Sequence, residues 1–87
     1  MPDIVYTHHA EEKFNVLKRH GFEVTREQVE ETLSAPDLLI PQTRERMIAQ
    51  RGITARHALR VVYRQDGDKR VVITFYPGRR ERYEANL

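Results

Sequence analysis

Arginine and tyrosine side chains gather in the last third of the chain, where they could bind and act on phosphate groups. Two alternating apolar runs between residues 57 and 83 flank Asp66-Gly67-Asp68. Gly67 can adopt a positive φ, so these three residues predict the turn of a β-hairpin. A two-residue turn would shift the pairing by one and mix apolar with basic positions, which favours the three-residue turn. In this register one face holds Leu59, Val61, Tyr63, Val71, Ile73 and Phe75, and the other holds Arg60, Arg64, Arg70, Thr74 and Tyr76, with Val62 and Val72 between them.

The basic face suits a polyanion, because guanidinium groups bind phosphate oxygens through paired hydrogen bonds. Cleavage of RNA without a metal ion would also need a base for the 2′-hydroxyl, cations for the developing charge and an acid for the departing 5′-oxygen. Arginine keeps its proton and can supply only the charge. The acid and the base must therefore come from His9, Lys13, His57, Tyr76, Glu81 or Tyr83; His9 is the first candidate for the base, and Tyr76 and Tyr83 could donate a proton or stack on a nucleobase.

The same residues also have plainer interpretations. His9 could orient its helix through a hydrogen bond to Glu12 or to the sheet, and the arginines could pair with acidic residues across the strands. The run Arg79-Arg80-Glu81-Arg82 could be solvated, as most charge runs are. Exposed ion pairs add little stability, so stability alone explains three arginines on one face poorly. Neither a metal site nor a cofactor is expected, since the chain has no cysteine and His8 and Glu12 supply only two ligands.

The charge of the chain is unevenly distributed. Residues 1–40 contain 8 acidic and 4 basic side chains, whereas residues 41–87 contain 5 acidic and 11 basic ones, for a formal net charge of +2. The basic half indicates a nucleic acid or an acidic protein as partner, or simply a salt-bridged surface. The length of 87 residues predicts one domain over residues 1–87. Without a signal-peptide pattern or an apolar run of about 18 residues, we expect a soluble cytoplasmic protein with no membrane contact.

Helix signals precede the hairpin. A short strand at residues 4–7 leads into a helix over about residues 9–20, which Gly21 ends. Thr25 and Gln28 form a capping-box pattern that starts a second helix, and Pro36 ends it. Residues 37–41 are predicted as an edge strand or an extended loop, and residues 44–50 as a strand or, alternatively, a helical turn. Pro77-Gly78 should break the last strand before a basic tail at residues 79–87. The expected fold is α+β, in the order β-α-α-β-β-β, with two helices on one face of a small antiparallel sheet.

Two stretches of the sequence resemble the RelE/ParE-like toxin superfamily, especially its BrnT-like branch and a neighbouring group of small domains of unknown function. His9-Ala10-Glu11-Glu12-Lys13 is similar to the opening of helix one in that group, and Lys18-Arg19-His20-Gly21-Phe22 resembles the turn that follows. The second stretch runs from Leu59-Arg60-Val61-Val62-Tyr63 to Val72-Ile73-Thr74-Phe75-Tyr76-Pro77-x-Arg79-Arg80-x-Arg82-Tyr83.

The resemblance implies a RelE-like fold, metal-free cleavage of mRNA, and an acidic antitoxin as partner. By position, Arg60 and Arg79 or Arg80 match the phosphate-binding arginines, and Tyr83 matches the tyrosine near the C-terminus. The lysine pair that ribosome-dependent members carry before the hairpin has no counterpart here. Arg44, Arg46 and Arg51 stand there instead, which argues against ribosome-dependent cleavage. We therefore expect a toxin-type endoribonuclease or, alternatively, a non-catalytic domain of this fold that binds an acidic protein or nucleic acid. The catalytic candidates are His9, Arg60, Arg80 and Tyr83, and the RNA-binding candidates are Lys13, Arg64, Arg70, Tyr76, Arg79 and Arg82.

Overall fold

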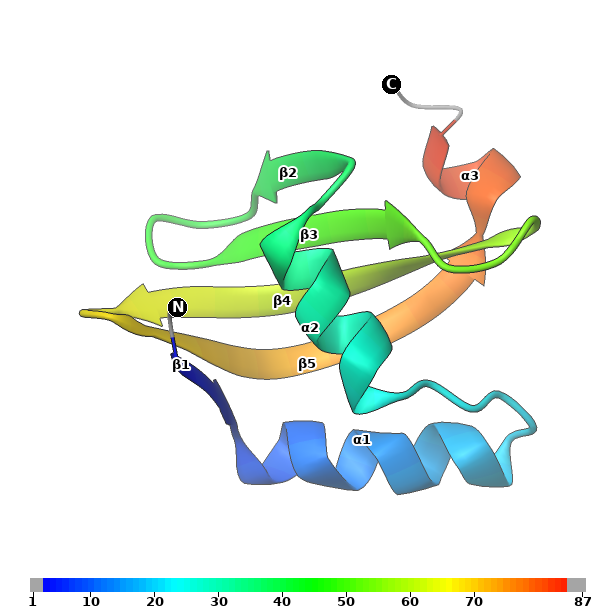
Figure 1. The fold of residues 1–87 in the computed structure, drawn as a ribbon, viewed down its shortest axis with the longest axis horizontal. Coiled ribbons are helices and arrows are strands. Elements are labelled where there is room, and N and C mark those ends of the chain that lie inside the picture. The colour runs from blue at the N-terminus through cyan, green and yellow to red at the C-terminus, as the bar shows by residue number, and fades with distance from the viewer. Residues whose placement is uncertain (1–2, 85–87) are drawn as a thin grey trace.

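A computed structural model describes residues 3–84 as one five-stranded sheet with three helices (Figure 1). The strands are ordered β1-β5-β4-β3-β2; β1 runs parallel to β5, and every other neighbouring pair is antiparallel. Of the expected basic tail at residues 79–87, residues 85–87 lie outside the described residues. The elements are β1 (Asp3–Tyr6), α1 (His8–Arg19), α2 (Arg26–Ser34), β2 (Leu38–Pro41), β3 (Met47–Gly52), β4 (His57–Asp66), β5 (Lys69–Arg79) and α3 (Arg80–Glu84).

Both long helices pack on the same face of the sheet, here called the helix face, and this confirms the expected α+β class. Thr7 caps α1 by accepting a hydrogen bond from the Ala10 amide, and Thr25 and Gln28 form the predicted capping box of α2. Figure 1 shows α2 in front of the sheet and α1 along its β5 side. Helix and sheet side chains share one buried core: Ala10, Val24, Val29, Leu33, Ala49, Leu59, Val61, Tyr63, Val72 and Phe75.

The turn of the β4–β5 hairpin differs from the predicted one. Asp66 pairs with Lys69, so the loop is the two-residue Gly67-Asp68, and Gly67 takes a φ of +60°. The three-residue turn was therefore wrong. A β-bulge then skips Ile73, because Tyr63 pairs with Val72 whereas the next residue back along β4, Val62, pairs with Thr74. The two-residue turn shifts the pairing of β5 with β4 by one residue from the prediction, and the bulge shifts it by one more. Beyond the bulge the total shift is two residues, so each side chain of β5 there lies on the face predicted for it.

The bulge explains which predictions for β5 were right. Beyond it, Phe75 is fully buried under the helices, as expected, whereas on its turn side Val72 occupies the core position predicted for Ile73. Val71 is buried, but it pairs with Arg64 and therefore shares the opposite face, here called the open face. Arg70 was predicted on the basic face, and this was wrong: it lies on the helix face and donates to the Leu33 carbonyl at the end of α2.

The junction between β1 and α1 is anchored at this bulge. The Thr7 amide donates to the Val72 carbonyl at 3.0 Å, and the Thr7 hydroxyl donates to the Ile73 carbonyl at 3.1 Å. One residue therefore caps α1 and satisfies the backbone of the bulged strand. The start of α1 is held against the edge of β5 as a result.

The end of the chain also departs from expectation. β5 continues through Pro77 and Gly78 to Arg79, so the predicted strand break is wrong. Pairing with β1 stops at Val72, which makes the far part of β5 an edge strand, where proline is tolerated. Of the expected tail at residues 79–87, Arg79 ends β5 and residues 80–84 form the short helix α3. Within residues 37–41, which were predicted as edge strand or extended loop, residues 38–41 form β2.

Candidate functional site

Arg60 occupies the centre of the open face. Its neighbours across the sheet are Gln50 on β3 and Tyr76 on β5. The Arg60 Nε donates to Gln50 Oε1 at 2.7 Å, and Gln50 is only 3% exposed. The guanidinium carbon of Arg60 lies 3.9 Å from the ring centroid of Tyr83. A buried amide and an aromatic ring therefore fix the position of this cation before any ligand binds.

A row of small residues makes room for α3 on the open face. Gly52, Ala58 and Gly78 are direct neighbours across β3, β4 and β5. A β-carbon on Gly78 would lie 2.3 Å from both Cζ and Oη of Tyr83, and one on Gly52 would lie 3.2 Å from Cζ of Arg80. Tyr83 and Arg80 therefore rest directly on the sheet backbone. The surface that Gly78 leaves open for the ring is here called the seat of Tyr83. Its signal in the sequence was a glycine near the end of each of two strands, which often marks a close approach to the backbone.

The hydroxyl of Tyr83 carries its proton at neutral pH, as an ordinary phenol does. Burial raises the pKa of Tyr83 above its ordinary value, the positive charge of Arg60 opposes this in part, and Tyr76 adds a smaller upward contribution. A phenol that retains its proton at neutral pH can donate a hydrogen bond or a proton. Tyr83 can therefore act as an acid beside a fixed cation.

Arg79 and Arg80 point to different sides of the sheet, although they are adjacent in the sequence. Arg80 lies over Gly52 on the open face, and its amide donates to the Arg56 carbonyl at 2.8 Å. Arg79 pairs with His57, at a helix-face position of β4, and its Nη1 is 3.6 Å from a carboxylate oxygen of Glu81. Of the two arginines, Arg80 is the one that accompanies Arg60.

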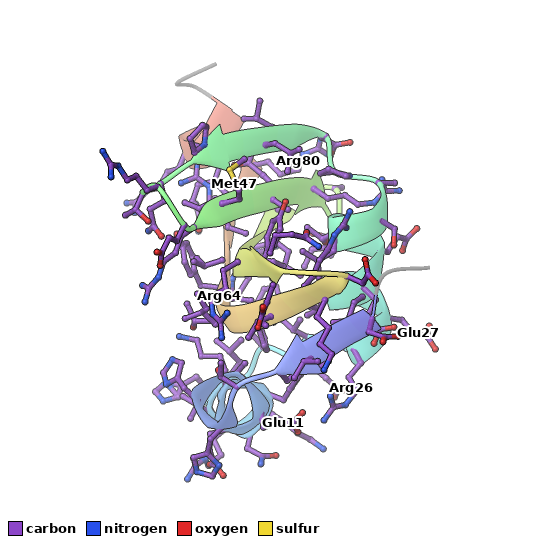
Figure 2. The ribbon with its side chains drawn as sticks, turned by 90° about the vertical axis from the view of Figure 1, so that its left-hand side faces the viewer. Glu11, Arg26, Glu27, Met47, Arg64 and Arg80 are labelled. Carbon is purple, nitrogen blue, oxygen red and sulfur yellow. The ribbon has the colours of Figure 1, made fainter. Side chains whose placement is uncertain are left out.

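Arg64 and Tyr76 extend the open face on either side of Arg60. Figure 2 shows Arg64 on the side of the sheet away from α2. Its Nη1 lies 3.5 Å from a carboxylate oxygen of Asp66, and both side chains are exposed. Tyr76 is half-buried directly beside Arg60. The open face thus gathers Arg60, Arg64, Tyr76, Arg80 and Tyr83.

His9 lies at the edge of this face instead of its centre. Its Nε2 is 3.2 Å from the hydroxyl of Thr74, an open-face residue of β5. Thr74 and Tyr76 are two residues apart, about 7 Å along the strand, so His9 is not in direct contact with the Arg60 position. Lys13 follows one turn later on α1 and is half-buried.

The remaining candidates lie outside this cluster. Arg70 is bound to the end of α2 on the helix face, and Arg82 is exposed on α3. Within residues 3–84, no group of three histidine, aspartate or glutamate side chains could hold a metal ion. Sequence reasoning missed Gln50, whose burial and bond to Arg60 appear only once β3 and β4 are paired.

Comparison with protein-family models, with curated proteins and with solved structures found no match to this chain. None of the helices between residues 3 and 84 is long and apolar enough to cross a membrane. The functional argument therefore depends on the geometry of the open face.

Proposed function

We propose that this protein is a metal-independent endoribonuclease of the toxin type, related to the RelE/ParE-like superfamily that its sequence resembles. The stacking of Tyr83 on Arg60, 3.9 Å from guanidinium carbon to ring centroid, carries the proposal. It joins a fixed cation to a phenol whose pKa is raised, on a face that neither α1 nor α2 covers. These are two of the three groups that phosphodiester cleavage without a metal needs.

The proposed reaction assigns each group one task. Arg60 and Arg80 bind the non-bridging oxygens of the scissile phosphate and stabilise the additional negative charge of the phosphorane. His9 takes the proton of the 2′-hydroxyl, whose oxygen then forms a bond to phosphorus. The bond from phosphorus to the 5′-oxygen breaks, and Tyr83 gives that oxygen its proton. The products are a 2′,3′-cyclic phosphate and a free 5′-hydroxyl.

The rest of the open face would hold the substrate strand. Tyr76, beside Arg60, can stack on a nucleobase, and Arg64 can bind the phosphate next along the strand. Lys13 would support His9 at the edge, while Arg79 and Arg82 would add positive charge near α3. Arg70 has no part in this proposal because it is bound to α2 on the helix face.

Cleavage of a mixed-sequence RNA in EDTA, with and without ribosomes, tests the proposal. Removal of one transition-state charge contact typically costs about 10²–10³ in rate, so Arg60→Ala and Arg80→Ala should each lose activity on that scale. Tyr83→Phe should do the same, because it removes the acid. Lys18→Ala, an exposed substitution on α1, is the control and should retain wild-type activity. Cleavage that survives the double substitution of Arg60 and Arg80 would place the reaction elsewhere.

A second candidate is a non-catalytic domain that binds an acidic protein or nucleic acid through the same face. The observation in its favour is the position of His9 beside Thr74, not beside Arg60. The wild-type protein would then bind RNA or an acidic antitoxin-like polypeptide without cleaving RNA and without arresting growth when expressed. RNA binding should in either case weaken steeply with salt, because bound phosphates release counterions.

A further inference from the structure

A pocket of about 370 Å³ lies at the end of the sheet, where the loop of residues 53–56 meets the junction of β5 and α3. Its walls are tied together by backbone hydrogen bonds. The Ile53 amide donates to the His57 carbonyl at 3.0 Å, and the Arg80 amide donates to the Arg56 carbonyl at 2.8 Å. The Thr54 hydroxyl accepts hydrogen bonds from the amides of Arg56 and His57. The pocket is lined by Ala55, Arg56, His57, Arg79, Arg80 and Glu81.

The chemistry of this lining suits an anion. The lining residues include three arginines and one histidine, against a single acidic residue, Glu81. Glu81 lies against Arg79, at 3.6 Å, so the charge of Arg79 is offset. Arg56 is exposed, and the ring of His57 packs against the ring of Phe22 in a T-shaped arrangement, at a centroid distance of 5.0 Å. One guanidinium group can donate two parallel hydrogen bonds to two oxygens of a phosphate, and this favours a phosphate group over a simple halide.

Arg80 connects this pocket with the Arg60 cluster. Its side chain lies over Gly52 on the open face, and the same residue lines the pocket. We propose that the pocket is a second phosphate subsite, in which Arg56 and His57 bind a phosphate group of the RNA strand whose scissile phosphate lies at Arg60. The identity of the ligand as RNA rests on the proposed function, whereas the affinity for phosphate rests on the pocket alone. Because Thr54 contacts Nδ1 of His57, Nε2 is the ring nitrogen assigned to the anion.

Binding of inorganic phosphate to the folded protein is the first test, with the histidine ring resonances as local probes. Saturable shifts at the ring of His57 are expected, while the exposed rings of His8 and His20, which belong to neither proposed phosphate site, stay unchanged. Arg56→Gln should weaken this binding about tenfold, the usual scale for a hydrogen bond to a charged group. Arg44→Gln, in the exposed loop before β3, is the charge-matched control and should have no effect. Equal shifts at all three rings, or equal effects of both variants, would overturn the subsite.

Binding of short RNA strands with a 5′-phosphate, a 3′-phosphate or two free hydroxyl ends then identifies which phosphate enters the pocket. The pocket is assigned to a terminal phosphate if a 5′-phosphate or a 3′-phosphate strengthens binding to the wild type but not to Arg56→Gln. An internal phosphate is assigned if Arg56→Gln weakens all three strands equally and lowers the salt dependence, the slope of log K against log salt, by about 0.7. If Arg56→Gln and Arg44→Gln weaken RNA binding equally, the subsite is refuted. If the wild type neither binds nor cleaves RNA, the proposed function fails, whatever phosphate does at His57.

Discussion

Substitution of Gly78 by alanine should displace Tyr83 from the sheet and change the free energy of unfolding only slightly. The added β-carbon would lie 2.3 Å from Cζ and Oη of Tyr83 and 2.8 Å from its Cε2. Nonbonded carbon atoms prefer about 3.5–4.0 Å, so the ring would have to move by more than about 1 Å. An aromatic ring cannot bend away as a long flexible side chain does. The substitution should therefore lift Tyr83 from the sheet and end its stacking on Arg60.

The expected change in overall stability is small because two effects oppose each other. The lost contact between Arg60 and the ring costs about 0.5–2 kcal/mol. Alanine within a strand is about 0.5–1 kcal/mol more favourable than glycine, and the φ of Gly78 is not positive, so alanine can adopt its conformation. The free energy of unfolding should change by about 1.5 kcal/mol or less. In contrast, the pKa of Tyr83 should fall toward its ordinary value of 10.0, since burial is the main cause of its elevation.

The assay is ultraviolet titration of tyrosine, with Tyr83→Phe used to assign the Tyr83 component, together with thermal unfolding and RNA cleavage. Gly52→Ala is the matched control, because its β-carbon meets only the flexible end of Arg80, at 3.2 Å. We expect Gly78→Ala to lower the pKa of Tyr83 and to reduce cleavage about 10²-fold or more, as loss of an acid does. Gly52→Ala should leave the pKa of Tyr83 in place. An unchanged Tyr83 titration in Gly78→Ala would refute the proposed seat.

Three further predictions concern the fold. Chemical denaturation should show that Val72→Ala costs about 2 kcal/mol and more than Ile73→Ala, because Val72 is fully buried in the helix-face core and Ile73 is half-buried at the bulge; the reverse order would contradict the observed register. Thr7→Ala should cost about 1–2 kcal/mol by the same measurement, since it removes the cap of α1 and the hydrogen bond to the bulge, whereas Thr7→Ser should restore most of this stability. Burial and, to a smaller extent, the nearby Glu30 raise the pKa of Tyr6, so the folded state keeps a proton that the unfolded state loses above about pH 10. The free energy of unfolding should therefore fall as the pH rises beyond that point. A Tyr6→Phe variant with the same pH dependence would disprove this origin.

The sequence alone determined the features that depend on local chemistry. Thr25 and Gln28 specified the start of α2, because a capping box needs only residues three positions apart. The alternation of Leu59, Val61 and Tyr63 specified the buried side of β4, since successive side chains of a strand point to opposite faces. It followed that Arg60 and Arg64 lie on the open face, where the structure has them. The α+β class followed from the order of these elements.

Only the tertiary structure decided the features that depend on contacts between distant segments. The bulge at Ile73 is bonded to Thr7, 66 residues earlier, so no local pattern in the hairpin could reveal it. The two-residue turn, to whose one-residue shift the bulge adds a second, places Arg70 on the helix face. Likewise, the seat of Tyr83 needs two glycines from different strands to become neighbours of one alanine, Ala58. A sequence lists which side chains are available for a site. Strand register decides which of them meet, because a shift of one residue moves a side chain to the other face of the sheet.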